Sequence, residues 1–197
     1  MDPALLRRAF DFALAAHGDQ IRKGLPVPFI SHLMGVASLV MEHGGDPEES
    51  AAALLHDTLE DTPTTAADLE AEFGPRIAGI VVACTDNLQP CPPAWRERKE
   101  RFILCIHETD PSSRLVIAAD KLHNARDVVR SQRDLGDAAF RPFQGRKEGT
   151  VWYYCAALSA LEETGDVREG FRALLGDLRR EVEEMERLAK LTVADEG

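Results

Sequence analysis

The sequence predicts an all-α protein, a single helical bundle of about eight to ten helices. Apolar residues recur at steps of three and four, helix-start signals precede most apolar segments, and no long segment alternates as a half-buried strand does. The chain of 197 residues is 44% hydrophobic and 29% charged, which is the balance of a soluble, core-forming domain. Since no internal repeat and no long linker divides the chain, we expect residues 1–197 to form one domain.

Helix-start signals define the N-terminal half of the chain. Asp2-Pro3 and Asp46-Pro47 each combine a capping carboxylate with a proline at the first helical position. A loop is expected over residues 24–28. The expected helices run from Pro3 past Leu14, from about His32 to Gly44-Gly45, from Pro47 to His56-Asp57, from a cap at Thr64 or Thr65 to Phe73-Gly74, and from Pro75 to Cys84.

The C-terminal half continues the helical pattern. Three prolines within residues 86–93 predict an irregular loop, and a second loop is expected over 133–145. Further helices are expected over residues 95–107, 111–129, 148–163 and 167–191. In the last of these, apolar residues from Phe171 to Leu188 recur at three- and four-residue steps, which indicates a stripe that faces the core or a partner.

Charge and hydropathy exclude several classes of function. A net charge of −11 is opposite to the broad basic surfaces of proteins that bind nucleic acid or acidic membranes, so we expect neither partner. No apolar run approaches the roughly 18 residues of a membrane span. Charged residues from Asp2 to Asp11 interrupt any export signal, and the four cysteines form no CxxC pair. We therefore expect a cytoplasmic protein with reduced thiols, for which a homo-oligomer is possible.

Four residues of the kind that hold a transition metal occur at or inside predicted helices: His32, His56, Asp57 and Asp120. Two imidazoles and two carboxylates suit manganese, iron or cobalt better than magnesium or calcium, which prefer oxygen ligands alone. Asp120 has apolar neighbours in the sequence, and a buried carboxylate is costly unless it is paired or bound to a metal. The simpler alternative is that Asp120 only pairs with Lys121 or with an arginine.

Four blocks of sequence carry a specific pattern. They are residues 17–24 (HGDQIRKG), 28–32 (PFISH), 52–62 (AALLHDTLEDT) and 119–127 (ADKLHNARD). An HD pair alone is unspecific, but the HDxxED block followed by DKLxNxRD is highly specific. On these residues the chain resembles the HD-domain metal-dependent phosphohydrolases, and within them the small alarmone hydrolases and the hydrolase half of the RelA/SpoT enzymes.

The resemblance implies an HD-domain helical bundle that binds manganese or a similar divalent transition metal. It also implies hydrolysis of the 3′-pyrophosphate of alarmone nucleotides such as (p)ppGpp or (p)ppApp, with release of pyrophosphate. The positions that match the family's metal ligands are His32, His56, Asp57 and Asp120. The positions that match residues lining its nucleotide and phosphate pocket are Arg22, Lys23 and Asn124.

Glu60 and Asp61 match the family's catalytic acidic pair. If the helix through His56 continues, the two carboxylates lie one turn past His56 and Asp57, where they can orient a water molecule and accept its proton. The alternative is that both carboxylates only cap the next helix or form a solvated acidic turn.

Further basic residues are candidates for holding the phosphates of an anionic substrate against the negative net charge. They are Lys121, the cluster Arg96, Arg98, Lys99 and Arg101, and Arg146 in the turn that leads into Trp152. For the cluster, a solvated helix face is the alternative, and for Trp152 the alternative is packing in the core.

Three segments depart from the family pattern. Phe29 and Leu33 stand where the family has tyrosine and proline, residues 85–93 replace a TDDK-like stretch, and Gly149 occupies the nearest match to a family tyrosine. These departures concern recognition of the base and phosphates rather than the metal. Two alternatives therefore stay open: an HD-type nucleotidase that acts on another phosphorylated nucleotide, and a non-catalytic nucleotide-binding module.

Overall fold

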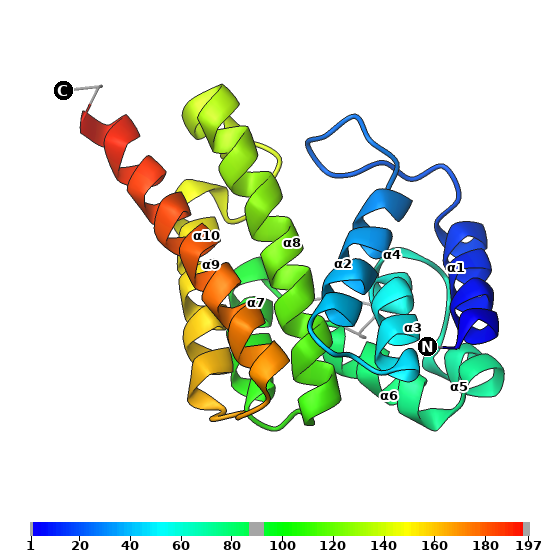
Figure 1. Cartoon of the computed structure of the whole chain (residues 1–197). Coiled ribbons are helices and arrows are strands. Elements are labelled where there is room, and N and C mark those ends of the chain that lie inside the picture. Colours follow the sequence, from blue (N-terminus) through cyan, green and yellow to red (C-terminus); the bar gives the residue numbers. More distant parts are fainter. Residues whose placement is uncertain (1, 87–92, 195–197) are drawn as a thin grey trace.

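The computed structural model describes residues 2–86 and 93–194, and within them the all-α prediction is confirmed (Figure 1). The α-helices are α1 (Pro3–His17), α2 (Ile30–Glu42), α3 (Pro47–Leu55), α4 (Thr58–Asp61), α5 (Ala66–Phe73), α6 (Pro75–Cys84), α7 (Trp95–Ile106), α8 (Pro111–Leu135), α9 (Arg146–Glu163) and α10 (Glu169–Ala194). A 3-10 helix, η1 (Gly136–Phe140), follows α8. Among the described helices, none is both long enough and apolar enough to cross a bilayer.

Side-chain caps fix where several helices begin. The Asp46 carboxylate accepts hydrogen bonds from the first turn of α3, and the Glu49 carboxylate accepts one from the backbone N–H of Asp46. Thr65 and Asp68 form the same reciprocal box at the start of α5. Each box satisfies backbone donors that have no partner inside the helix, which is why the sequence signals for these starts were reliable.

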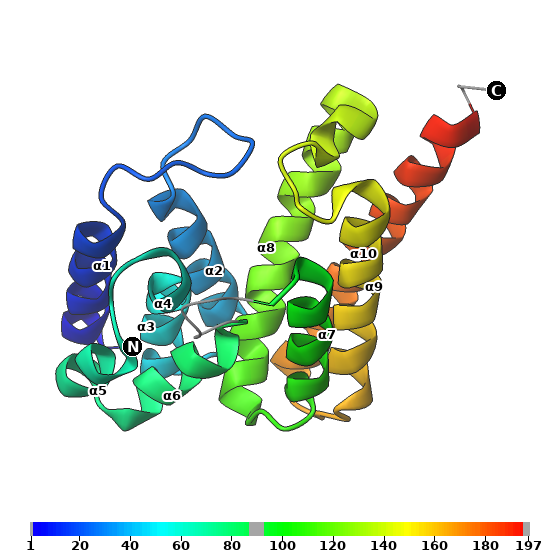
Figure 2. The same ribbon diagram turned by 180° about the vertical axis from the view of Figure 1, so that it is seen from behind.

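The long helix α8 is the centre of the architecture. It packs against α2, α3 and α6 on one side and against α9, α10 and η1 on the other. Figures 1 and 2 show helices α1 to α6 gathered on one side of α8, with α7, α9 and α10 on the opposite side. A side chain in the middle of α8 can therefore meet residues from both halves of the chain.

Apolar side chains from both sides of α8 form one buried cluster. Leu33 of α2, Leu55 of α3, Leu122 of α8 and Leu174 of α10 are all fully buried in it. Burial of each such side chain contributes about 1.5–3 kcal/mol, so this cluster fixes α2, α3 and α8 relative to one another. Those are the helices that carry the predicted metal ligands.

The end of α8 differs most from the sequence-based expectation. Helix α8 does not stop near Val129 but continues to Leu135, and residues 136–140 form η1, so the predicted loop over 133–145 is wrong for its first part. The added turns still pack on α10: the buried Gln132 side chain donates to the carbonyl of Met185. The loop predicted over 86–93 falls largely on residues 87–92, which lie outside the described residues.

Gly170 provides a test of the packing between α10 and the end of α2. A Cβ atom added to Gly170 would lie 1.9 Å from the carbonyl oxygen of His43. We expect Gly170→Ala to destabilise the protein by about 1–3 kcal/mol, because the helices must separate to relieve the overlap. Gly176→Ala is the matched control on the same helix, since its Cβ would meet only the Arg180 side chain at 3.8 Å. Equal melting temperatures of the two variants by circular dichroism would contradict the close approach.

Candidate metal-dependent active site

The four predicted metal ligands converge from three parts of the fold. His32 lies on α2, His56 and Asp57 follow α3, and Asp120 lies in the middle of α8. The His32 Nε2 atom lies 3.2 Å from Asp120 Oδ1 and 3.4 Å from Asp57 Oδ2. The corresponding distances from His56 Nε2 are 3.6 Å and 3.2 Å, and the two Nε2 atoms are 3.2 Å apart. His32, His56 and Asp57 therefore form one compact group of potential ligands, and Asp120 Oδ1 lies beside both histidines.

Both imidazoles are buried, and each is held through its other ring nitrogen. His56 Nδ1 lies 2.8 Å from the carbonyl oxygen of Ala53. Because a carbonyl only accepts, His56 donates its Nδ1–H there, which leaves its Nε2 lone pair facing the cluster. His32 Nδ1 lies 3.0 Å from Nδ1 of His123. Ligating histidines in metal sites are commonly fixed in this way by a partner of the second nitrogen.

Asp120 uses its two oxygens for different partners. The Oδ2 atom accepts a hydrogen bond of 2.6 Å from Lys121 Nζ. The Oδ1 atom faces the two histidines and also accepts a bond of 2.5 Å from Asn124 Nδ2. The alternative in which Asp120 merely pairs with Lys121 thus accounts for only one of its oxygens, because the other belongs to the cluster.

The electrostatics of the cluster favour bound positive charge. Burial by itself would lower the pKa of His56, but Asp57 and Asp120 outweigh this effect and raise that pKa well above its ordinary value. Burial by itself would raise the pKa of Asp57, but the neighbouring His56 and His32 outweigh this effect and keep that pKa far below its usual range. The two carboxylates are therefore ionised beside two imidazole nitrogens in a buried place. This donor set fits a divalent transition metal, whose charge would take the place of the proton on His56.

The acidic pair, Glu60 and Asp61, lies on α4, which is separated from α3 by a break in the helix. Helix α3 ends at Leu55, His56-Asp57 form a turn, and α4 begins at Thr58, so the helix through His56 does not continue unbroken to Glu60. The one-turn spacing nevertheless persists, because the backbone N–H groups of Glu60 and Asp61 both donate to the carbonyl of Asp57, at 3.2 Å and 3.0 Å.

The acidic pair does not cap α5. That helix is capped by Thr65 and Asp68, whose side chains and backbone N–H groups bond reciprocally. Glu60 and Asp61 instead line a cavity together with Asp57 and Asp120. The capping interpretation of the pair is therefore incorrect.

Burial and neighbouring carboxylates make both acids weaker. Burial, with Asp86 and Asp57 nearby, raises the pKa of Glu60 to about 7. Its Oε1 atom also accepts a hydrogen bond of 2.6 Å from the backbone N–H of Asp86. Burial and Asp57 raise the pKa of Asp61 above its usual value. A carboxylate that titrates near neutral pH is suited to accept a proton from water.

A cavity of about 510 Å³ opens onto the cluster. Its acidic part is formed by Asp57, Glu60, Asp61 and Asp120. Other lining residues are basic, polar or aromatic, and include Lys23, Trp95, Arg98, Lys99, Lys121, Asn124, Thr150, Tyr153 and Tyr154. Acids and cations that face one cavity can hold a polyanion through a bound metal ion and through charge-assisted hydrogen bonds.

The basic cluster of α7 divides between the cavity and the exposed surface. Arg98 and Lys99 line the cavity and share the buried carboxylate of Asp86, at 2.6 Å and 2.5 Å. Arg96 and Arg101 instead pair with glutamates one turn away on the exposed side of the helix. A solvated helix face thus describes Arg101, whereas the exposed Arg96 also places its guanidinium over the Trp152 ring, 3.2 Å from its centroid. Arg98 and Lys99 line the cavity.

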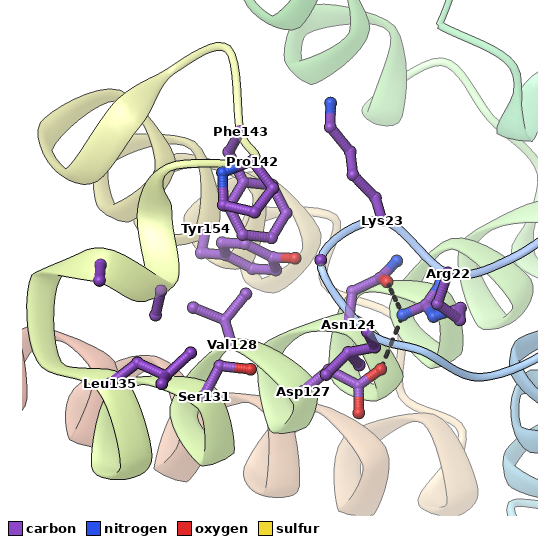
Figure 3. A pocket seen from close by; sticks show the side chains of 14 residues that line it. Arg22, Lys23, Asn124, Asp127, Val128, Ser131, Leu135, Pro142, Phe143 and Tyr154 are labelled. Atoms are coloured by element: carbon purple, nitrogen blue, oxygen red, sulfur yellow. Dashed lines mark hydrogen bonds and ion pairs between the residues drawn. The ribbon is translucent and has the colours of Figure 1, made fainter.

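A smaller cavity of about 90 Å³ adjoins the larger one, and the two share the lining residues Lys23, Asn124, Phe143 and Tyr154 (Figure 3). Arg22 Nη2 donates to Asn124 Oδ1 at 2.7 Å and to Asp127 Oδ2 at 2.8 Å. In Figure 3 the Lys23 side chain extends away from this network. The charge of Arg22 is therefore already paired, and the residue orients Asn124, whose amide in turn bonds Asp120.

Arg146 lies apart from both cavities. It is exposed, and its guanidinium donates to the carbonyl of Arg141 at 2.7 Å. Two further residues contact the site, His123 and Asp86, and neither was among the predicted site residues. His123 follows Asp120 by three residues, a spacing that places both on one face of α8 and could have signalled its position. Asp86 lies in the stretch 85–93 that was compared with the family's TDDK-like pattern, and that comparison could have signalled it.

The chain matches one protein family and several characterised proteins. The HD-domain family profile covers residues 9–147. The guanosine-3′,5′-bis(diphosphate) 3′-pyrophosphohydrolase MESH1 of Danio rerio is 42% identical over 132 residues, which span 64% of this chain and 71% of that protein. The guanosine-3′,5′-bis(diphosphate) 3′-pyrophosphohydrolase of Aquifex aeolicus is 36% identical over 123 residues, which span 62% of this chain and 18% of that longer protein.

A solved structure is similar over nearly the whole chain. It is that of a metazoan orthologue of SpoT described as hydrolysing ppGpp. The TM-score is 0.73 at 25% identity, and the match covers 91% of this chain and 96% of that one. The bundle of ten described helices thus has a close counterpart in fold.

Glu60 should make the stability of the metal-free protein depend on pH. Because its folded pKa of about 7 exceeds the ordinary value of 4.5, folding favours the protonated acid, and stability falls as pH rises through this window. We expect Glu60→Gln, which keeps the acceptor for Asp86, to raise the melting temperature at pH 8 and to change it little at pH 4. Glu70→Gln, on the exposed face of α5, is the control for removing one negative charge. A gain that is equal at both pH values would contradict the buried, raised-pKa environment.

Proposed function

The chain belongs to the HD-domain family, and from that premise we propose that it is a metal-dependent hydrolase of the 3′-pyrophosphate of alarmone nucleotides such as (p)ppGpp or (p)ppApp. The observation that carries the proposal is a compact group of His32, His56 and Asp57, with Asp120 beside both histidines. The carboxylates of this group and the acidic pair line one cavity together with cations. The names of the similar proteins support the same reaction class. A small-molecule substrate in the cytoplasm, without nucleic acid or membrane as partner, suits a chain of net charge −11.

We assign His32, His56, Asp57 and Asp120 as the ligands of a divalent cation. Two imidazoles with two carboxylates favour manganese or a similar transition metal over calcium or magnesium. When bound, such a cation neutralises charge that develops on phosphoryl oxygens and makes a nearby water a stronger acid. Asn124 and Lys121 hold the Asp120 carboxylate in place, and Ala53 holds His56.

Glu60 is the proposed general base. It lines the cavity together with Asp57, and because its pKa is about 7, much of it is ionised at neutral pH. It accepts the proton of the attacking water, while the Asp86 N–H keeps its carboxylate oriented. Asp61, whose pKa is also raised, lies beside it in the cavity and helps to orient the same water.

The cations of the cavity hold the phosphates. Lys99 and Arg98 reach it from α7, Lys121 from α8, and Lys23 from the loop before α2. The oxygen of water forms a bond to the phosphorus next to the ribose 3′ oxygen, and the bond between that phosphorus and the 3′ oxygen breaks. The 3′ oxygen takes up a proton, so the products are pyrophosphate and a nucleotide with a free 3′-hydroxyl.

A screen of nucleotides tests the proposed reaction. Guanosine and adenosine nucleotides that carry 3′-diphosphate, 3′-monophosphate or only 5′-phosphates should be incubated with the manganese-loaded protein, with separate detection of phosphate and pyrophosphate. We expect pyrophosphate release from 3′-diphosphates alone. Release of single phosphates from 5′-nucleotides would support the alternative nucleotidase, and no turnover of any member would support a binding module.

The acidic pair distinguishes general-base catalysis from catalysis by the metal alone. Glu60→Gln and Asp61→Asn preserve shape but cannot accept a proton in the same way. We expect kcat to fall about 10²–10⁴-fold for Glu60→Gln, and by less for Asp61→Asn, with little change in KM. Both variants should keep their manganese by elemental analysis. Near wild-type single-turnover rates would refute the assigned role.

The ligand assignment predicts a specific loss of metal. Asp57→Asn removes one anionic donor while its partially exposed side chain leaves the core intact. We expect manganese affinity to fall by at least an order of magnitude, and the rise in melting temperature that manganese gives the wild type to shrink accordingly. Asp68→Asn, which alters only the cap of α5, is the control variant. Full manganese content in Asp57→Asn would remove this residue from the ligand set.

A further inference from the structure

We propose that His123 is a positioning residue that fixes the tautomer and orientation of His32, and that Gly35 is present to leave room for the His123 ring. This inference rests on the metal-binding part of the proposed function and is independent of which nucleotide is the substrate. It goes beyond the four ligands and the acidic pair, because His123 does not itself reach the cluster.

The His32 and His123 rings contact each other between α2 and α8. Nδ1 of His32 and Nδ1 of His123 lie 3.0 Å apart, and the ring planes meet at 64° with centroids 4.8 Å apart. Nε2 of His32 points the other way, toward Asp57 and Asp120. For that Nε2 to offer a lone pair to a cation, the His32 proton must be on Nδ1. His123 Nδ1 then accepts this proton in a hydrogen bond and carries its own proton on Nε2.

His32 depends on a side chain for this support, whereas His56 does not. The second nitrogen of His56 is held by the Ala53 carbonyl, which belongs to the same helical turn. The second nitrogen of His32 has the His123 ring as its hydrogen-bond partner among the described residues. Its orientation therefore depends on how α8 is seated against α2, which ties the metal site to the packing of the bundle.

Gly35 lies one turn after His32 on α2, where its backbone is next to the His123 ring. A Cβ atom added there would lie 2.2 Å from His123 Nε2 and 2.3 Å from Cδ2. The backbone of Gly35 does not need positive φ, so space rather than conformation explains the glycine. A glycine inside a helix is unfavourable relative to alanine, and here it permits the close approach of the imidazole.

Gly79 offers a matched control for this argument. It is also an interior helical glycine, in α6, but a Cβ added to it would meet nothing within 4 Å. Gly79→Ala therefore tests the replacement of a helical glycine without a steric contact, whereas Gly35→Ala adds the contact with the His123 ring.

The experiment measures manganese affinity of the full chain by competition with a fluorescent chelator, and the melting temperature of the metal-free protein by circular dichroism. The variants are Gly35→Ala, Gly79→Ala, His123→Leu, His123→Asn and the double variant with Gly35→Ala and His123→Asn. Asparagine places an amide near the Nδ1 position and is smaller than imidazole, so it can restore the hydrogen bond and relieve the overlap with an alanine at position 35.

We expect Gly35→Ala and His123→Leu to weaken manganese binding by about 10- to 100-fold, as is typical when the partner of a ligating histidine is lost. Gly79→Ala should bind as the wild type does, and His123→Asn should lie between wild type and His123→Leu. In the His123→Asn background, Gly35→Ala should have no further effect on affinity, because the clashing ring is gone.

Wild-type manganese affinity in Gly35→Ala and His123→Leu would overturn the inference. So would a loss of affinity in Gly35→Ala that persists at equal size in the His123→Asn background, since the clash would then not be the cause. If the metal-free melting temperature falls but manganese affinity does not, His123 is structural only. A wild-type protein that binds no divalent cation would overturn the metal site itself, whereas absence of alarmone turnover with intact manganese binding would leave this inference standing.

Discussion

The carboxylate of Asp120 lies inside the central helix of the bundle, and its burial is the constraint on which the site depends. Ala118, Ala119 and Leu122 around it are fully buried in the core, so the charge cannot be solvated by turning outward. An unpaired carboxylate in such a place would cost several kcal/mol. Lys121 and Asn124 on one side and the two histidines on the other offset that cost. Folding of α8 against α2 and α3 therefore assembles the cluster.

The cavity beside the cluster is organised by acids as much as by cations. Asp86 is nearly inaccessible, yet it binds both Arg98 and Lys99 and presents its backbone N–H to Glu60. It thus connects the phosphate-binding side of the cavity with the acidic side. The Asp127 carboxylate likewise accepts a hydrogen bond from Arg22 and neutralises its charge. In a chain of net charge −11, such pairs keep the cations ordered before a ligand arrives, which lowers the entropy lost on binding.

Close approaches between helices depend on particular glycines. The Trp95 ring lies where a Cβ of Gly145 would be, at 2.5 Å, and it forms part of the cavity wall. Gly149 borders the same ring, with its Cβ position 3.0 Å away. Gly145 and Gly149 therefore leave room for an indole from α7 that lines the cavity.

The sequence by itself determined the all-α class and the helix starts with side-chain caps, and it supplied the four proposed ligands and the proposed acidic pair. These features depend on local chemistry and on short spacings, such as the reciprocal box at Asp46 and the HDxxED block. Local patterns of this kind can be read without knowing which segments meet. The end of α8 could not be found in this way, because only its packing on α10 extends it to Leu135.

Tertiary structure alone decided which charges face the cavity and which partners support the ligands. On α7, Lys99 binds Asp86, whereas Arg96 lies at the surface and pairs with a glutamate of the same helix. In the sequence both were members of one basic cluster. Arg146 matched the expected chemistry but lies elsewhere, while His123 reached His32 across two helices. Such contacts join residues far apart in the chain, and their geometry depends on how helices cross. A spacing rule carries no information about that crossing, so it predicts the ligands but not their supports.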